Sequence, residues 1–310
     1  VLVRIRHVGI CGTDFHIFAG KHPFLEYPRV MGHELSGTVE AAPEGSGLTP
    51  GEPVYIVPYL ACGDCQACRI GLTNACVNIR VLGVHTDGGM AELIAVPARN
   101  VVPTGGIPLE DAAMIEFLAI GAHGVRRGAI SARDRVLVTG AGPIGMSAVI
   151  FAKARGADVT VMDMRPDRLA FARERLGADA ALIADAGAEA SAQHLTGGDW
   201  FDVVIDATGA APPIERGFGF LAHGARYVLL SVVRQDITFS DPEFHKREAT
   251  LIASRNALPD DFAEVVAQMR AGRVPTRALN THRGSLDDGA ALLRDWSRPE
   301  AGVIKAILDL

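Results

Sequence analysis

The sequence lacks the features of a membrane or secreted protein. Its longest apolar run, Tyr227 to Val233, has the length of a buried strand, whereas a helix that crosses a bilayer needs roughly 20 apolar residues. No stretch has the pattern of a signal peptide, and the sequence also begins without methionine. We therefore expect no membrane partner and a cytoplasmic location.

The sequence has no block of basic residues either. Its 30 lysines and arginines are interspersed among 36 acids, and the formal net charge is −6. Proteins that bind nucleic acid or anionic membranes usually concentrate positive charge on one face. The charge pattern therefore argues against a nucleic-acid partner. At 310 residues the chain is long enough for two domains with separate cores.

Cysteine is scarce, and an odd total of five does not suit a framework of paired disulfides. Four of the five lie together, at Cys62, Cys65, Cys68 and Cys76. The alternatives are two local disulfides or a redox dithiol, but disulfides at this spacing would be strained, whereas four thiolates can hold a structural zinc ion tetrahedrally. We predict such a closed site, because zinc binding of about 10–16 kcal/mol can fold a loop that has little core.

The remaining cysteine, Cys11, lies in a glycine-rich stretch that precedes His33 and Glu34. A thiol, an imidazole and a carboxylate can form a three-ligand zinc site that keeps one position open for substrate. We expect a loop here, with a glycine on either side of Cys11 allowing a tight turn around the metal. Because the other thiols are committed, a second anionic ligand must be a carboxylate, either Glu34 or Glu116. The alternative is a buried cysteine beside a satisfied histidine pair.

Two polar residues that follow Cys11 could move a proton. Thr13 would hydrogen-bond the oxygen of a bound substrate. His16 would pass the proton outward, directly or through a cofactor hydroxyl. Both side chains are therefore predicted to lie beside the open position of the zinc site.

The chain changes character near residue 110, from β-rich to alternating strands and helices. Glycines and prolines separate the strands expected at 1–8, 34–40, 51–59 and 88–97. Beyond them, alternation predicts a parallel sheet covered on both faces. The expected helices there are 111–127, 144–155, 167–176 and 213–221, and the expected strands are 135–139, 158–162, 181–183, 201–206, 225–231 and 251–254.

A glycine motif follows the strand 135–139 and opens a helix. It comprises Gly140, Gly142, Pro143, Ile144 and Gly145. In this context the glycines let the backbone approach a pyrophosphate, which the helix N-terminus stabilises. The motif therefore predicts a bound dinucleotide.

Asp163, at the end of the second strand, predicts which dinucleotide binds. Its carboxylate would accept hydrogen bonds from the ribose and repel a 2′-phosphate, which favours NAD over NADP. Arg165 and Arg168 are close enough to weaken this preference, Arg168 as a contact to the cofactor, although a solvated helix start would also explain both. Thr208, which follows the strand 201–206, is expected at the same carboxyl edge beside the cofactor.

The last fifty residues predict two helices, 259–270 and 285–296, and a closing strand, 301–310. The alternating region leaves no strand for this closing strand to pair with. We therefore expect the chain to return to the β-rich domain.

Together these motifs resemble those of the zinc-dependent medium-chain alcohol dehydrogenases, over essentially the whole chain. The stretches that carry the resemblance are GICGTDFH, GHELSGTVE, CGDCQACRIGLTNAC, DGGMAELIAVP and GAGPIG. The resemblance implies an α/β fold in which a doubly wound Rossmann domain, 116–254, is inserted into a GroES-like catalytic domain, 1–115 and 255–310. It also implies a homodimer or homotetramer, and a chain that lacks an initial stretch of the catalytic domain.

Within this family the sequence is most similar to the polyol branch. Glu116 falls where alcohol dehydrogenases have a second catalytic thiolate, and Arg255 falls where sorbitol dehydrogenases have a substrate-cleft arginine. The stretches HPFLEYPRVMGHE, VLGVHTDGG and SDPEFHKREATLIASRNALPDDF resemble bacterial dehydrogenases that act at C5 of hexonates such as L-galactonate or L-gulonate. One departure is the absence of a proline after Glu116, which would change the placement of that carboxylate.

These residues predict oxidation of a secondary hydroxyl of a polyol or sugar acid, with zinc polarising the oxygen and NAD accepting hydride. Arg255 would clamp a hexonate carboxylate through charged hydrogen bonds worth roughly 1.5–3 kcal/mol each; a cofactor contact or an ion pair is the alternative. Lys21, His22 and His85 are weaker candidates for this role. Sorbitol or threonine oxidation is the nearest alternative function, and a non-catalytic NAD-binding sensor or structural protein is the alternative of another class.

Overall fold

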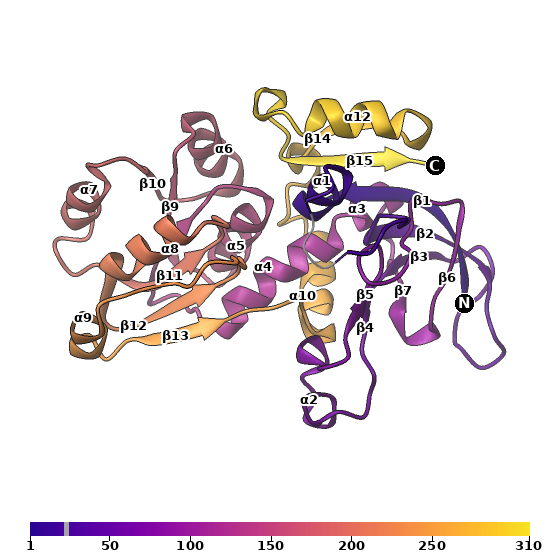
Figure 1. Cartoon of the computed structure of the whole chain (residues 1–310), viewed down its shortest axis with the longest axis horizontal. Helices are drawn as coiled ribbons and strands as arrows, with labels where there is room; N and C mark the ends of the chain where they lie inside the picture. The colour runs from indigo at the N-terminus through magenta and orange to yellow at the C-terminus, as the bar shows by residue number, and fades with distance from the viewer. Residues whose placement is uncertain (22–24) are drawn as a thin grey trace. The chain divides into compact units, whose positions relative to one another are not determined.

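The structure is a computed structural model that describes residues 1–21 and 25–310. The chain forms two compact units (Figure 1). Unit 1 comprises Val1–Phe117 and Leu258–Leu310, and unit 2 comprises Leu118–Ala257. The boundaries predicted from the sequence fall after residues 115 and 254, within three residues of those in the structure.

Unit 1 is built on a seven-stranded sheet with the order β14-β15-β1-β2-β3-β7, and β6 also pairs with β1 (Figure 1). The strands are β1 (Leu2–Ile10), β2 (Glu34–Ala41), β3 (Pro53–Ile56), β6 (Leu93–Ala95), β7 (Val101–Pro103), β14 (Asn280–Ser285) and β15 (Lys305–Asp309). Val3, Ile5 and Val8 of β1 are buried in the core of this unit. The closing strand β15 pairs antiparallel with β1, so the two ends of the chain lie in one sheet.

Short helices and a small hairpin complete unit 1. They are α1 (Gly12–Phe18), α2 (Gln66–Arg69), α3 (Leu109–Ala112), α10 (Pro259–Arg270), α11 (Thr276–Leu279), α12 (Gly289–Trp296), β4 (Tyr59–Leu60) and β5 (Arg80–Val81). The expected loop after Cys11 is wrong, because these residues form α1. Asp14 starts this helix by accepting a hydrogen bond from the Cys11 backbone N–H at 2.9 Å.

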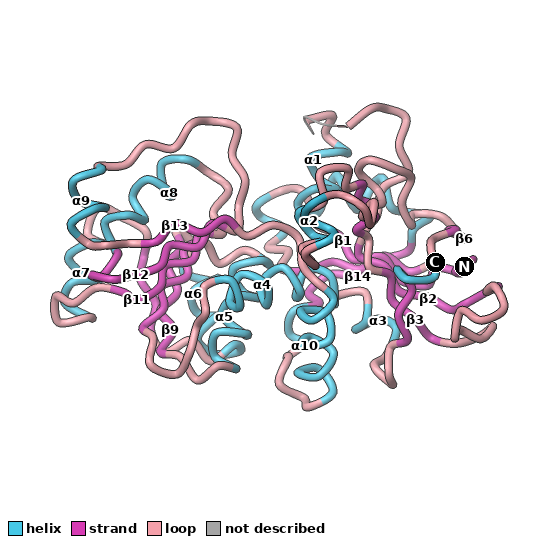
Figure 2. The backbone as a smooth tube through the Cα atoms, turned by 90° about the horizontal axis from the view of Figure 1, so that it is seen from below, coloured by secondary structure: helices cyan, strands magenta, loops and turns pink. Residues whose placement is uncertain are grey.

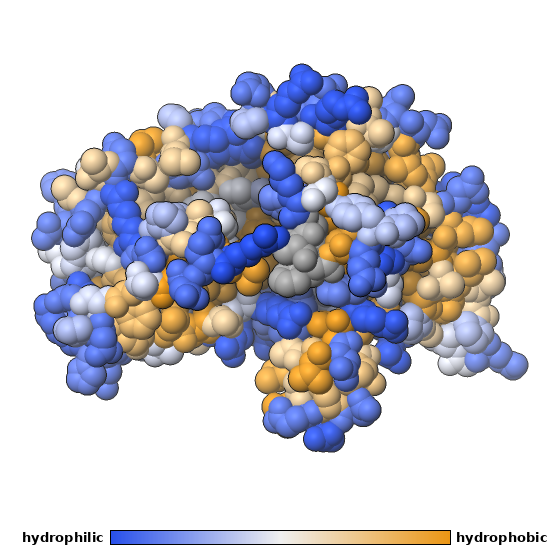
Figure 3. Space-filling model, in the orientation of Figure 1, coloured by the Kyte–Doolittle hydropathy of each residue, from blue (hydrophilic) through white to orange (hydrophobic). Residues whose placement is uncertain are grey.

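The lobe between β4 and β5 carries the four clustered cysteines and an apolar surface. Ile70, Leu72 and Val77 are all exposed, Val77 at 75%. Figure 3 shows orange, apolar side chains over this lobe, which carries α2. Little of the apolar surface is therefore inside the lobe, which agrees with folding by metal rather than by a core.

Unit 2 is a parallel sheet with the order β10-β9-β8-β11-β12-β13. Its elements are β8 (Arg135–Thr139), α5 (Pro143–Ala154), β9 (Asp158–Asp163), α6 (Pro166–Leu176), β10 (Ala180–Ile183), α7 (Ala188–Leu195), β11 (Phe201–Asp206), α8 (Ala211–Gly217), β12 (Leu221–Leu229), α9 (Asp241–Lys246) and β13 (Thr250–Ala253). Helices α5 and α6 lie on one face of the sheet and α8 on the other (Figure 2), which is the doubly wound arrangement. None of the helices that the structure describes is both long and apolar enough to cross a bilayer.

Four elements differ from those expected. The helix expected at 111–127 is divided into α3 and α4 (Ile115–Arg127), and the helix expected at 213–221 ends at Gly217 because β12 already begins at Leu221. The strand β14 has no apolar alternation, since its residues NTHRGS lie at the edge of the sheet. Helix α7 was not expected, since its apolar face consists mainly of alanines.

Candidate active site

Strand register brings the three expected zinc ligands together. In the antiparallel pair of β1 and β2, Gly9 lies opposite Glu34. Cys11 follows the end of β1 and His33 precedes β2, so both lie at the same end of this pair. The ligand atoms of Cys11, His33 and Glu34 all lie within 4.8 Å of one another.

The surroundings of His33 suit a cation. Nδ1 of His33 and Oδ1 of Asp14 are buried without hydrogen-bond partners among the described residues, and they lie 3.9 Å apart. Burial alone would lower the pKa of His33, but the charge of Asp14 and the neighbouring Cys11 outweigh it and raise that pKa well above its usual value. Groups that favour a proton here also favour a metal ion, so the donor set fits zinc.

Asp14 is a residue of this site that sequence analysis missed. Its Oδ2 accepts the Cys11 N–H while Oδ1 faces His33, so one buried carboxylate contacts both sides of the ligand set. Histidines that bind metal commonly donate their second ring N–H to such a carboxylate, which fixes their orientation. The available signal was an acid three residues after Cys11, at the spacing of a helix cap.

Position 9 requires glycine because the Glu34 side chain approaches the backbone there, and not because the chain turns. Neither Gly9 nor Gly12 has a positive φ, so neither uses the backbone freedom that a tight turn would require of glycine. The expected tight turn around Cys11 is therefore wrong. A Cβ at residue 9 would instead lie 2.2 Å from Oε2 of Glu34. The missing side chain lets Glu34 of β2 reach across β1 toward β15.

Glu34 meets a buried lysine that sequence analysis also missed. Nζ of Lys305, on β15, donates to both carboxylate oxygens of Glu34, at 2.6 and 2.5 Å, and to the Ile10 carbonyl at 3.0 Å. The side chains of Lys305 and Glu34 are 1% and 0% exposed, and the ammonium lies 4.3 Å from the ring centre of Phe117. The signal was a lysine inside the apolar strand VIKAIL, because lysine is rarely buried without a partner.

Glu116, the other carboxylate considered as a ligand, lies near the same site. It is not in the cluster of ligand atoms formed by Cys11, His33 and Glu34. The Tyr59 hydroxyl donates a hydrogen bond to Oε1 of Glu116. Burial raises the pKa of Glu116, and the charge of Glu34 raises it further against the opposing effect of His33.

The proposed proton carriers lie on α1. Thr13 is half-buried and His16 is exposed. They are three residues apart on one helix, a spacing that places both side chains on the same face. The helix therefore offers a path from the half-buried Cys11 at its start toward solvent.

The clustered cysteines fit a metal site and not disulfides. The four Sγ atoms lie within 4.8 Å of one another, and those of Cys62 and Cys76 are 3.4 Å apart, well beyond a disulfide bond of roughly 2.05 Å. Backbone N–H groups of Cys68 and Val77 lower the pKa of Cys65 to about 6, whereas burial raises the pKa of Cys68 to about 12. Without a metal, one thiol of the group is thus favoured as a thiolate while another is held protonated, and a divalent cation allows all four to be thiolates.

The glycine loop of unit 2 has the shape that a pyrophosphate requires. Gly140 has φ of 91°, and a Cβ on Gly145 would lie 1.8 Å from the Gly140 carbonyl oxygen. Gly142 precedes the first residue of α5, and a Cβ there would meet nothing within 4 Å. Pro143 and Ile144 begin the helix, where proline costs no hydrogen bond. The open space therefore lies at a helix N-terminus, which favours an anion.

Asp163 contacts this loop through its own carboxylate. Its two oxygens accept the backbone N–H groups of Ala141 at 2.6 Å and Arg165 at 2.8 Å. Arg165 pairs with Asp167 at the helix surface, as a solvated helix start requires. Arg168, in contrast, is not part of a solvated helix start, because it is only 8% exposed. Burial and the charge of Arg165 lower its pKa.

Of the remaining expected residues, Thr208 and Arg255 follow strands of the same sheet. The Thr208 hydroxyl donates to the buried Asp206 at 2.7 Å, which fixes the turn after β11. Arg255 is exposed and lies two residues beyond the end of β13. In the sheet β13 is three strands from β8, so the two strands are roughly 14 Å apart at 4.8 Å per strand. Lys21 and His85 are exposed in unit 1, and His22 lies outside the described residues.

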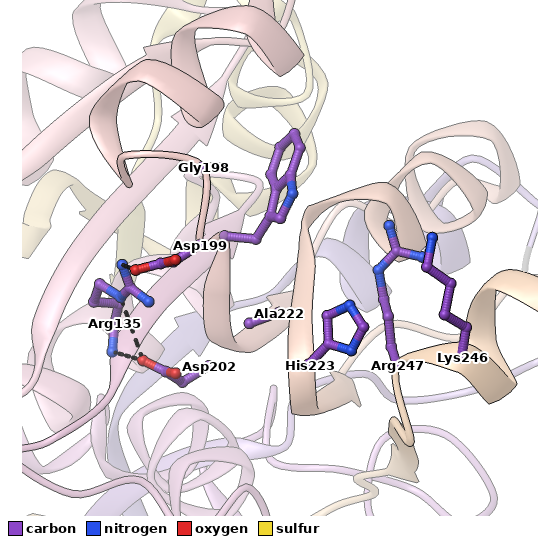
Figure 4. A pocket seen from close by; sticks show the side chains of 9 residues that line it. Arg135, Gly198, Asp199, Asp202, Ala222, His223, Lys246 and Arg247 are labelled. Carbon is purple, nitrogen blue, oxygen red and sulfur yellow. Dashed lines mark hydrogen bonds and ion pairs between the residues drawn. The ribbon is translucent and has the colours of Figure 1, made fainter.

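A cavity of about 440 Å³ opens at the other edge of this sheet, where β8 and β11 begin (Figure 4). Arg135 faces Asp199 and Asp202 across one wall, at 3.6 Å from each. Arg247, on the other wall, pairs with Glu243. The cavity is thus separated from Gly140 and Asp163 by the length of the strands, and it does not belong to the dinucleotide site.

A parallel sheet with a dinucleotide loop and a β-rich unit with an open three-ligand metal set define an enzyme of hydride transfer. Residues 1–108 match the alcohol dehydrogenase GroES-like domain, and residues 143–271 match the zinc-binding dehydrogenase domain. The chain belongs to the zinc-binding alcohol dehydrogenase family.

Individual relatives have related activities or cofactors. The chain is 43% identical to L-galactonate-5-dehydrogenase of Escherichia coli K12 over 91% of this chain and 83% of that protein. An alcohol dehydrogenase structure from Escherichia coli CFT073 in complex with NADH superposes with a TM-score of 0.93 at 30% identity, over 100% of this chain and 91% of that one. A zinc-binding dehydrogenase from Sinorhizobium meliloti 1021 bound to NADP gives 0.92 at 28% identity, over 100% and 92%.

Proposed function

We propose that this chain oxidises a secondary hydroxyl of a hexonate such as L-galactonate or L-gulonate, with zinc and NAD. The observation that carries the proposal is the set of Cys11, His33 and Glu34, whose ligand atoms lie within 4.8 Å of one another and of which His33 and Glu34 are buried. This set occurs in a chain that is 43% identical to an L-galactonate-5-dehydrogenase.

Cys11, His33 and Glu34 would hold the catalytic zinc, and their arrangement leaves a fourth position for substrate. Zinc supplies a Lewis acid that lowers the pKa of a bound hydroxyl. Thr13 would hydrogen-bond the reacting oxygen, and the exposed His16 on the same helix face would carry the proton to solvent. The buried Lys305 would limit the negative charge that Glu34 contributes to the site.

The other expected binding residues have structural or cofactor roles in this proposal. NAD accepts the hydride when bound, and its pyrophosphate would lie at the N-terminus of α5. Asp163 has lone pairs left for the adenosine ribose, while Arg168 and Thr208 would support the cofactor from the start of α6 and the end of β11. The cofactor loop is Gly140, Gly142, Pro143, Ile144 and Gly145, and the structural zinc would bind Cys62, Cys65, Cys68 and Cys76.

Arg255 would bind the carboxylate that distinguishes a hexonate from a neutral polyol, because a guanidinium can bind a carboxylate through two hydrogen bonds. Sorbitol and L-threonine are the alternative substrates. Threonine is less favoured, since its ammonium would require a nearby acid in addition.

We also propose that the protein functions in the cytoplasm as a homodimer or homotetramer. Four zinc-binding thiols need a reducing compartment, which supports this location. Sedimentation equilibrium of the zinc-loaded protein would test the oligomeric state, and a monomer at micromolar concentration would contradict it.

The function is tested by NADH formation from L-galactonate, L-gulonate, D-sorbitol, L-threonine and a simple secondary alcohol. We expect the hexonates to have the highest kcat/KM. Arg255→Ala should then lower kcat/KM for hexonates by roughly 10–150-fold, the equivalent of 1.5–3 kcal/mol, and change sorbitol oxidation little. Sorbitol turnover without hexonate turnover would refute the carboxylate clamp, and no turnover with intact NAD binding would favour the non-catalytic alternative.

A further inference from the structure

Two buried carboxylates lie at the candidate metal site, and each has its own hydrogen-bond donor. Glu34 lies in the cluster of ligand atoms and is paired with Lys305. Glu116 lies outside that cluster and accepts from the hydroxyl of Tyr59. An open metal site has room for only one protein carboxylate beside a thiolate and an imidazole. The hydrogen-bond donors Lys305 and Tyr59 can therefore influence which of the two carboxylates binds the metal.

The Tyr59 hydroxyl is held firmly in place. The Tyr59 backbone carbonyl accepts from the Asn100 side chain at 3.0 Å, and the residue belongs to β4, which pairs with β5. Its ring is buried and lies edge-on to Phe262, with ring centres 6.1 Å apart. Main chain and ring are thus both fixed, so the hydroxyl is directed at Glu116 and not at solvent.

We propose that Tyr59 is a positioning residue that keeps Glu116 away from the catalytic metal, so that the fourth coordination position stays open for the substrate hydroxyl. This inference rests on the zinc site proposed above. A buried carboxylate needs a hydrogen bond or a cation, because burial without one is costly. Without the Tyr59 hydroxyl, the metal is the cation that Glu116 would turn to.

Tyr59 also connects the two metal sites. It lies three residues before Cys62, on the strand that enters the cysteine lobe. Folding of the lobe around its zinc therefore fixes the position of the Tyr59 hydroxyl. In this way the structural site contributes to the geometry of the catalytic one.

The test uses full-length protein loaded with Co²⁺ in place of zinc, with imidazole as a small ligand for the open position. In the wild type, imidazole should shift the cobalt d–d absorption bands. Tyr59→Phe should bind the same amount of cobalt but need at least about tenfold more imidazole for the same shift, because a tethered carboxylate competes at millimolar or higher effective concentration. Combining Tyr59→Phe with Glu116→Gln should restore imidazole binding.

Tyr55→Phe is the matched control. Tyr55 is also buried and stacks on Phe262, with ring centres 6.2 Å apart, but it lies on β3 and burial alone raises its pKa to about 12. Removing its hydroxyl should leave the imidazole response unchanged. A similar loss in Tyr55→Phe would overturn the inference, because it would indicate a general packing defect.

The outcomes separate this inference from the proposed function. If wild-type protein binds cobalt in the cysteine lobe alone, or shows no imidazole response, the catalytic zinc site itself is refuted. If the wild type responds and Tyr59→Phe responds equally, only the role of Tyr59 is overturned. Glu116→Gln alone provides a check that does not depend on the folding of Tyr59→Phe. It should retain both metals and the imidazole response, and loss of one metal would show that Glu116 is the resting ligand.

Discussion

Replacing Lys305 with methionine would remove the cation that faces Glu34 and leave an apolar side chain of similar volume. The ammonium donates to both Glu34 oxygens at 2.6 and 2.5 Å, and neither side chain is accessible to solvent beyond 1%. Removing one partner of a buried ion pair costs about 3–5 kcal/mol, because the other charge is left unpaired. For a domain of this size each kcal/mol lowers Tm by roughly 2–4 °C. We therefore expect metal-free Lys305→Met to melt roughly 6–20 °C below the wild type.

The assay is thermal unfolding followed by circular dichroism, with and without zinc. Zinc should reduce the deficit of Lys305→Met, because the metal replaces the ammonium as the countercharge of Glu34. Adding Glu34→Leu to Lys305→Met should restore most of the metal-free stability, since an apolar pair avoids the buried charge. Lys153→Met is the control, because Lys153 and Asp179 form a partly exposed pair worth about 0–1 kcal/mol. Equal metal-free stability of Lys305→Met and wild type would refute the argument.

Three further substitutions test other parts of the molecule. Cys65→Ser should lose one zinc per chain and lower Tm, measured by metal analysis and calorimetry; full stability with one zinc lost would refute a structural role. Asp163→Ala should weaken NAD binding and narrow its advantage over NADP in titration calorimetry, and an unchanged ratio would exclude that role. Asp14→Asn should lower the affinity of the proposed catalytic site for zinc by about 10–100-fold in chelator competition, since the variant lacks the charge that faces His33. The affinity of the cysteine lobe for zinc should stay unchanged.

The parts of the molecule that sequence analysis predicted well have short-range signals. The four cysteines lie within fifteen residues, and the glycine motif lies between a strand and a helix that each have their own apolar pattern. Strands 135–139 and 201–206 and helix 259–270 have the bounds expected from those patterns. Local chemistry therefore sufficed to predict that the four cysteines come together and where the glycine loop and its flanking strand and helix lie.

The residues that were missed act through contacts between distant segments. Lys305 lies 271 residues from Glu34, and Tyr59 lies 57 residues from Glu116. Neither pairing follows from spacing, because it depends on strand order and on the room left by Gly9. Helix α1 was missed for a different reason, since Asp14 had a local capping signal that the glycines around Cys11 obscured.

The insertion of unit 2 between the segments of unit 1 has a consequence for synthesis. Glu34 leaves the ribosome 271 residues before Lys305, an interval of roughly 15–55 s at 5–20 residues per second. During that time unit 2 can fold, while β1 waits for β15 and the nascent chain exposes an unpaired strand edge. The proposed catalytic metal site therefore gains the ammonium that pairs with Glu34 only after all of unit 2 has been translated.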